Sequence, residues 1–294
     1  MKRIFLAGVA ALSVTAAAVA EDSPLWLRNT ALSPDGSTIA FTFKGDIYTV
    51  PFGGGDAMRL TASPAYDSWP VWSPDGKTIA FGSDREGSVD IYTVPATGGT
   101  PVRITTHSGN ETPKAYLDDT HILYSSNIMA DAQAAMGPFQ AQTYVVEATP
   151  GARPALFMSY PATSISVDGG RILYQDRKGY EDVLRKHERS SGTSDIWLLT
   201  LGADGKAKDG TFKQLTTFNG QDQSPVWNRS TDGGFYYVSE EDGTLNVYFA
   251  NINGGEKRQL TKFTTHPVRS LSASADGKKL AFSQGGEIYT LIPG

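Results

Sequence analysis

Four histidines are the side chains of this 294-residue chain best suited to acid–base or metal chemistry: His107, His121, His187 and His266. None stands in a recognisable catalytic pattern. The Gly-x-Ser-x-Gly elbow of serine hydrolases is missing, and so is the His-Glu spacing of helical zinc sites. The chain has no cysteine, which excludes disulfides, zinc thiolates and a thiol nucleophile. We therefore expect no catalytic residue within this chain.

Polar loop residues are better candidates for binding than for catalysis. One set lies in short polar segments that precede predicted strands: Asp67, Trp69, His107, Asn110, Glu111, Asp222, Gln223 and His266. A second set lies in a basic insert: Arg185, Lys186 and His187. These groups suit a peptide or protein ligand, although such loops can also be solvated or pack on a neighbouring domain. Asp67, Asn110 and Asp222 carry oxygens suitable for Ca²⁺. Isolated loop carboxylates more often cap turns, so we predict no metal and no cofactor.

The candidate loops lie between strands and turns that recur along the chain, so this repeat must position them. Residues 32–51 and 72–95 share a Ser-Pro-Asp-Gly turn, an Ile-Ala-Phe strand and an Asp-Ile-Tyr-Thr-Val-Pro strand. Each is followed by a Gly-rich turn and a short Arg-Leu-Thr or Arg-Ile-Thr strand. Six such units are recognisable, and their turns lie about 40, 43, 50, 64 and 44 residues apart, the range of propeller blades.

The repeat predicts an all-β fold, a six-bladed β-propeller of four-stranded antiparallel blades over residues 21–294. Four short strands cannot bury both faces alone, so each unit must stack on its neighbours. A β-sandwich is the alternative, but the regular four-part unit argues against it. The last unit ends at Tyr289–Gly294 without an obvious fourth strand. Either residues 22–29 supply that strand, or the chain is a piece of a longer protein.

Propeller geometry would gather the candidate residues on one face. The loops that enter each inner strand share a face with the loops between the second and third strands, and the Asp-Gly turns lie on the other face. The long loops 125–143 and 175–194 belong to the first of these faces. We therefore expect a binding surface around the mouth of the central channel.

The first twenty residues read as a signal peptide. Lys2 and Arg3 precede an apolar stretch, and Ala18-Val19-Ala20 fits the small-x-small cleavage rule. Export to the periplasm is the expected destination, and no segment is long and apolar enough to span a membrane. The formal charge of −5 and the lack of a basic cluster argue against nucleic-acid binding.

Residues 70–77, 83–87 and 90–92 resemble the TolB-type propeller repeat, which occurs in TolB, in tricorn-like proteases, in prolyl-oligopeptidase relatives and in free periplasmic propellers. Residues 26–29 and the insert 178–187 resemble the N-terminal propeller of secreted bacterial tricorn-like proteases. That resemblance implies a second propeller, a PDZ-like domain and a serine-protease core farther along a longer chain.

Three functions follow as hypotheses. The first is a non-catalytic propeller that gates or docks peptide substrates of a tricorn-like serine protease. The second is a stand-alone TolB-like periplasmic protein-interaction propeller. The third is a lyase or lactonase that uses His and Asp at the channel mouth, which would lose activity when His107 or His266 is changed to Ala.

Overall fold

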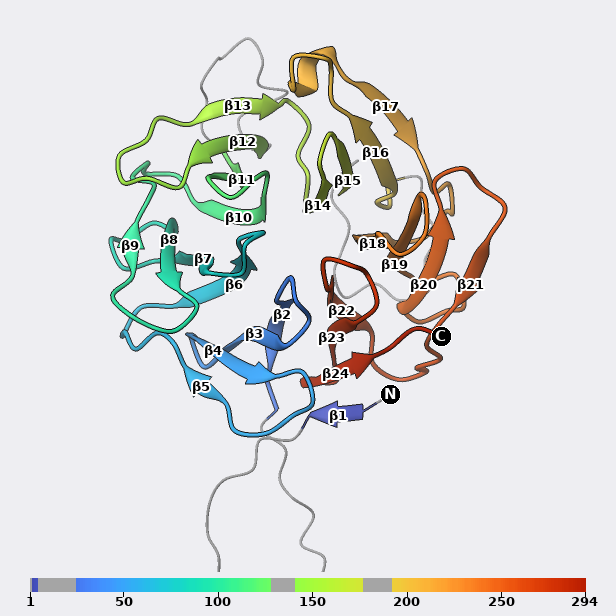
Figure 1. Cartoon of the computed structure of the whole chain (residues 1–294), viewed down its shortest axis with the longest axis horizontal. Helices are drawn as coiled ribbons and strands as arrows, with labels where there is room; N and C mark the ends of the chain where they lie inside the picture. Colours follow the sequence, from blue (N-terminus) through green and yellow to red (C-terminus); the bar gives the residue numbers. More distant parts are fainter. Residues whose placement is uncertain (1, 5–24, 128–140, 177–191) are drawn as a thin grey trace, which may run out of the picture.

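Six four-stranded antiparallel sheets form a closed ring, as the sequence predicted (Figure 1). The computed structural model describes residues 2–4, 25–127, 141–176 and 192–294. The first blade contains β2 (Arg28–Leu32), β3 (Thr38–Phe43), β4 (Asp46–Pro51) and β5 (Met58–Arg59). The second contains β6 (Asp67–Trp72), β7 (Thr78–Ser83), β8 (Asp90–Pro95) and β9 (Val102–Arg103). The third contains β10 (Glu111–Tyr116), β11 (His121–Ser126), β12 (Gln142–Glu147) and β13 (Ala155–Met158).

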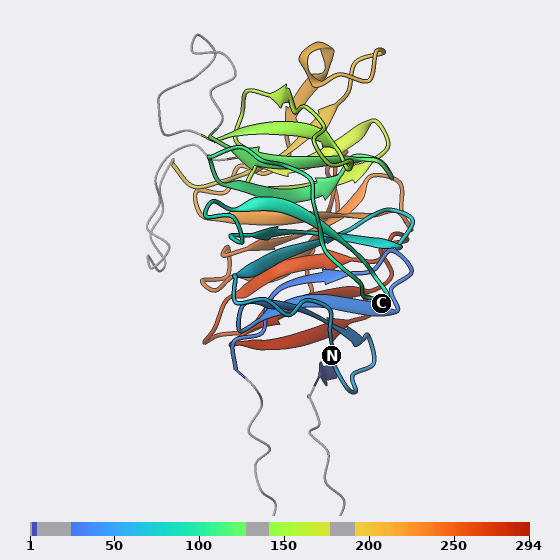
Figure 2. The same cartoon turned by 90° about the vertical axis from the view of Figure 1, so that its left-hand side faces the viewer.

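The later blades repeat this order from the centre outwards. The fourth contains β14 (Ser164–Asp168), β15 (Arg171–Gln175), β16 (Ile196–Thr200) and β17 (Thr211–Gln214), with a short 3₁₀ turn, η1 (Ala207–Asp209), before its last strand. The fifth contains β18 (Asp222–Asn228), β19 (Gly234–Ser239), β20 (Asn246–Asn251) and β21 (Lys257–Gln259). The sixth contains β22 (Val268–Ala273), β23 (Leu280–Gln284) and β24 (Glu287–Leu291). Seen edge-on, the blades form a thick disc (Figure 2).

The sixth blade is completed by the start of the chain. Strand β1 (Lys2–Ile4) pairs antiparallel with β24, with Lys2 opposite Thr290 and Ile4 opposite Ile288. This corrects the expectation that residues 22–29 supply the missing strand. Arg28 and Asn29 already belong to the inner strand of the first blade, and residues 22–24 lie outside the described residues. The sequence did not reveal this pairing because residues 1–20 read as a signal peptide, which remains a prediction.

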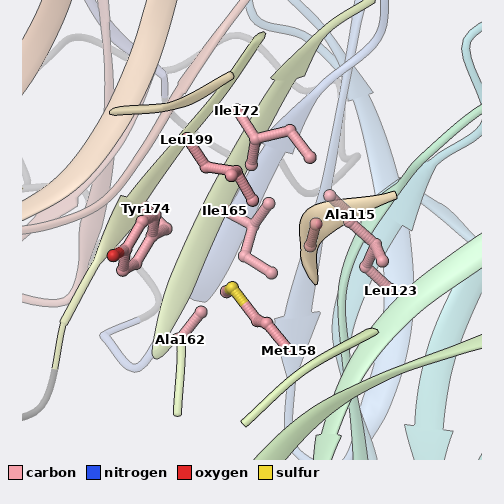
Figure 3. Packing of buried hydrophobic residues seen from close by; sticks show 9 residues of the cluster. Ala115, Leu123, Met158, Ala162, Ile165, Ile172, Tyr174 and Leu199 are labelled. Atoms are coloured by element: carbon pink, nitrogen blue, oxygen red, sulfur yellow. The ribbon is translucent and has the colours of Figure 1, made fainter. Parts of the chain in front are cut away.

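The hydrophobic core is divided into six layers, one between each pair of neighbouring blades, including the pair formed by the sixth and the first. Figure 3 shows the layer between the third and fourth blades, where Leu123 and Met158 face Ile165. Each fully buried Ile or Leu contributes about 1.5–3 kcal/mol. Because every layer needs both blades, we expect no blade to be stable alone.

The Ser-x-Asp-Gly turns are fixed by their own side chains. In the second blade Ser73 Oγ donates to Asp75 Oδ1 at 2.6 Å, and the Lys77 amide donates to the same oxygen at 3.0 Å. These bonds lower the pKa of Asp75, with the Ser73 bond the largest cause. Gly76 has a φ of +70°, a backbone conformation that favours glycine. The predicted hairpin chemistry is therefore present.

Carboxylates at or just before the start of the third strand tie the first, second and fourth blades together. Asp46 accepts a hydrogen bond from Arg59 at 2.7 Å, and Asp90 accepts one from Arg103 at 2.7 Å. Asp195 accepts one from Gln214 at 2.8 Å. These contacts give the three aspartates a structural role within their blades. Between blades, the indole N–H of Trp72 donates to the Ala31 carbonyl at 2.9 Å.

Among the described residues no helix is long and apolar enough to cross a bilayer.

Candidate functional site

Three of the predicted mouth residues are carboxylates buried between blades rather than exposed at the channel mouth. Asp67, Glu111 and Asp222 occupy the first position of β6, β10 and β18, and each is at most 1% exposed. Each lies opposite a serine of the neighbouring second strand, namely Ser83, Ser126 and Ser239. A ligand on the surface cannot reach these carboxylates without displacing side chains that cover them.

The three carboxylates differ in whether a positively charged side chain lies beside them. Asp67 forms an ion pair with Arg85, with Nη2 and Oδ2 2.6 Å apart. Burial raises the pKa of Glu111 to about 7, and the nearby Asp90 carboxylate adds to the rise. Burial also raises the pKa of Asp222 to about 7, although the Ser239 and Thr216 hydroxyls oppose the shift. Glu111 and Asp222 can therefore take up a proton near neutral pH.

The other predicted residues are accessible to different degrees. Trp69 is 40% exposed. His107 and Asn110 are exposed, but both accept backbone hydrogen bonds. His107 Nδ1 accepts from the Gly109 amide of its own loop at 2.9 Å, and Asn110 Oδ1 accepts from the Val89 amide of the β7–β8 loop at 3.1 Å. Gln223 is half-buried in β18, where it pairs with Val238. These residues come from the second, third and fifth blades.

Among the predicted residues, His266 lines a surface cavity. This entry-face pocket has a volume of about 660 Å³ and lies between the segment before β2 and the sixth blade. Its lining comprises Leu25, Trp26, Leu27, Arg28, Asn29, His266, Pro267, Arg269, Ser270, Ser283, Gln284, Gly285 and Gly286. No aspartate or glutamate is among them, in a chain that has 31 acidic residues against 26 basic ones.

Trp26 and Arg28 form the most accessible part of the pocket. The Trp26 side chain is 65% exposed, and the Arg28 guanidinium lies 4.9 Å from the centre of its ring. Leu25 next to it is 56% exposed. Arg269, on β22, adds a second guanidinium for which the described residues provide no ion pair. An exposed aromatic ring beside unpaired cations suits an extended ligand that carries a carboxylate.

Three non-glycine residues that line the pocket have a positive φ. Trp26 has a φ of 87°, a value that bulky residues rarely adopt. Asn29 and Ser270, which also line the pocket, have φ values near 52° and 53°. The Leu27 amide donates to the Gly286 carbonyl at 3.0 Å and fixes the segment against the sixth blade. Trp69 and Ser224 have a φ of 53° at the bulges of the second and fifth blades that correspond to those containing Asn29 and Ser270. The conformation of Asn29 and Ser270 therefore belongs to the repeat, whereas that of Trp26 is particular to the pocket.

Sequence reasoning missed Trp26, Arg28 and Arg269 as site residues. Trp26 and Arg28 precede the first repeated turn, so the repeat does not mark them as loop residues. Arg269 lies within an inner strand, where an outward side chain is unexpected. Two signals were available, an apolar Leu-Trp-Leu run before the first strand and the lack of acidic residues around His266.

The basic insert Arg185, Lys186 and His187 lies outside the described residues. In the rest of the chain, no three His, Asp or Glu side chains come together in a way that could hold a metal ion.

The fold and its repeats define a six-bladed β-propeller of four-stranded antiparallel blades. Comparison with known proteins shows which propeller family the chain belongs to. The chain belongs to the family described as the Tricorn protease N-terminal beta propeller domain, whose profile matches residues 24–294. This agrees with the resemblance noted from residues 26–29.

Individual relatives agree with that assignment. The Tricorn protease of Thermoplasma acidophilum is 27% identical over 277 residues, which cover 92% of this chain and 24% of that protein. A crystal structure of the tricorn protease matches with a TM-score of 0.72 and 24% identity, over 92% of this chain and 25% of that one. A putative TolB from Agrobacterium tumefaciens matches with a TM-score of 0.63 and 18% identity, over 92% of each chain. The chain spans about a quarter of the length of the tricorn relatives.

Proposed function

We propose that this propeller is a non-catalytic domain that docks or gates peptide substrates of a tricorn-like serine protease, with the entry-face pocket as the contact site. Family membership supports the protease context. The single observation that carries the proposal is the pocket itself, where exposed Trp26 lies beside Arg28 in a lining without acidic residues.

The geometry suits an extended peptide better than a compact small molecule. Two more exposed aromatic side chains lie at the start of the next blade, Tyr66 at 48% exposure on the loop before β6 and Trp69 at 40% within β6. The Tyr66 ring packs against Gly45 of the first blade, so this loop and the first blade share one surface. Aromatic rings give sequence-tolerant contact area, and the guanidiniums of Arg28 and Arg269 favour carboxylates.

Binding of labelled decapeptides tests the proposal. Two fluorescein-labelled peptides would be compared by fluorescence anisotropy, one with three glutamates and one with three lysines in the same apolar background. The acidic peptide should bind more tightly, and Arg28→Ala combined with Arg269→Ala should weaken it by roughly tenfold. Trp26→Ala should weaken both peptides.

Arg153→Ala is the matched control, because Arg153 is an exposed arginine before the outer strand of the third blade. Equal affinity for the two peptides, or equal losses in the control and the pocket variants, would refute the contact site. Circular dichroism of each variant separates loss of binding from loss of fold.

The natural protein should be several times heavier than this 31.6 kDa chain, because the chain matches only 24% of the length of the Tricorn protease of Thermoplasma acidophilum. An immunoblot of the source cells measures this directly. A product near 31.6 kDa would instead favour the second candidate, a stand-alone TolB-like interaction propeller. In either case we propose export to the periplasm by the predicted signal peptide, which N-terminal sequencing of the mature protein would test.

A further inference from the structure

The axis of the propeller contains a second cavity, of about 310 Å³, lined by the inner strands of all six blades. One position on each inner strand forms a ring around this axis. Strand pairing aligns the six members of this axial ring: Thr30, Pro70, Lys114, Ile165, Pro225 and Leu271. Lys114 is the one ionisable side chain in the axial ring, and its neighbours there are mostly apolar.

Lys114 is placed there by an irregularity in β10. Pro113 pairs with Tyr124 and Ala115 pairs with Leu123, so Lys114 is the extra residue of a β-bulge. Ala115 and Tyr116 pack into the core layers on the two sides of the third blade. The bulge therefore leaves Lys114 directed at the axial cavity, whose lining includes it.

The amine of Lys114 has no hydrogen bond or ion pair to any described residue. Burial lowers its pKa to about 8, and no neighbouring charge contributes to the shift. Arg229, the other cation in the lining, is fully engaged: it forms an ion pair with Asp168 at 2.7 Å and donates to the Ala275 carbonyl at 2.9 Å. No aspartate or glutamate lines the cavity.

We propose that the axial cavity binds a small carboxylate, with the Lys114 ammonium as its ion-pair partner. An ammonium ion in apolar surroundings is unfavourable unless a counterion accompanies it, and the protein supplies none here. The axial ring suits a short carboxylate better than a bare halide, because Ile165 and Leu271 would contact its alkyl part. This site is separate from the entry-face pocket and does not depend on the function proposed for that pocket.

Lysine NMR tests the proposal on the intact chain. With ¹³Cε-labelled lysine, the Lys114 signal is assigned by its loss in Lys114→Met. Sodium acetate, added at constant ionic strength against sodium chloride, should raise the pKa of this one lysine and also raise the melting temperature. Lys114→Met should weaken acetate binding roughly tenfold or more, whereas Lys114→Arg should retain it.

Matched variants and ligands separate the outcomes. Lys77→Met, at an exposed lysine of a turn, should bind acetate as the wild type does. Arg28→Ala with Arg269→Ala should also bind acetate normally, which keeps this test independent of the peptide site. The tripeptide N-acetyl-Ala-Ala-Ala and its C-terminal amide distinguish a peptide terminus from a free carboxylate as the source of the ligand. A Lys114 pKa that acetate leaves unchanged, or an equal response to chloride, would overturn the proposal.

Discussion

The second and third blades differ in whether a buried carboxylate at the start of the inner strand has a cation beside it. Both begin their inner strand with a carboxylate that is buried against the preceding blade, Asp67 in one and Glu111 in the other. Asp67 is neutralised by Arg85, two residues after the serine that faces it. The corresponding residue of the third blade is Ile128, and in the fifth blade, where Asp222 begins the inner strand, it is Glu241.

This difference coincides with the raised pKa values of Glu111 and Asp222, which have no arginine at this position. Where the repeat retains an arginine, the buried carboxylate has a counterion. In the third and fifth blades, which have no arginine at this position, burial raises the pKa of Glu111 and of Asp222 to about 7. A repeated scaffold can therefore preserve the shape of a buried position while its charge balance diverges from blade to blade.

Of the three substitutions considered, removal of Arg85 should change the free energy of unfolding most. Arg85→Met would leave Asp67 as an unpaired buried charge, and the free energy of unfolding at pH 7 should fall by about 3 kcal/mol. Urea unfolding measures the change, with Arg153→Met as the exposed control. A loss no larger than that of the control would show that the ion pair does not stabilise the second blade.

Glu111→Gln should have a smaller effect of opposite sign. The pKa of Glu111 is raised from 4.5 in the unfolded chain to about 7 in the folded one. Between these values the folded state holds a proton that the unfolded state has released, so stability falls as pH rises from about 4.5 to about 7. Above pH 7 the variant should be more stable than the wild type by about 2–3 kcal/mol. Thermal unfolding at pH 5 and pH 8 compares them, and an unchanged pH profile would contradict the shift.

Introducing an arginine into the fifth blade, at the position that corresponds to Arg85, should have the smallest effect of the three. Glu241→Arg places a cation at the position in the fifth blade that Arg85 occupies in the second, and it also removes the partner of Lys257. The pKa of Asp222 should then fall from about 7 by about one unit or more. Carboxyl ¹³C NMR measures this pKa, with Glu241→Gln as the control for loss of the original acid. A pKa that stays near 7 would show that the position alone does not recreate the ion pair.

The sequence predicted the fold because the repeat is made of local signals. Turn residues such as Asp75 and Gly76, and the alternation within strands, act over a few positions, and their chemistry appears in the structure as expected. It predicted the candidate site less well. Entry-loop carboxylates look alike in the sequence, and only three-dimensional packing shows that Asp67 and Glu111 are buried whereas Trp26 is exposed.

Contacts between residues far apart in the chain escaped prediction for the same reason. The pocket joins residues 25–29 to residues 266–286, a proximity that ring closure creates and that no local pattern encodes. The β-bulge that directs Lys114 to the axis is likewise invisible in the sequence, because Thr-Pro-Lys-Ala reads as an ordinary strand.

The pairing of β1 with β24 places a strand of the sixth blade inside the segment that the sequence predicts to be a removable leader. Residues 2–4 precede the predicted cleavage site, so removal of the leader would strip one strand from the sixth blade and leave β24 as a bare sheet edge. Such an edge can accept a strand from another polypeptide. The β24 edge would then be covered by β1 in the precursor and exposed only after cleavage, so its exposure would follow maturation in a fixed order. Amide exchange in residues 287–291 should accelerate on cleavage if that order holds, and stay unchanged if it does not.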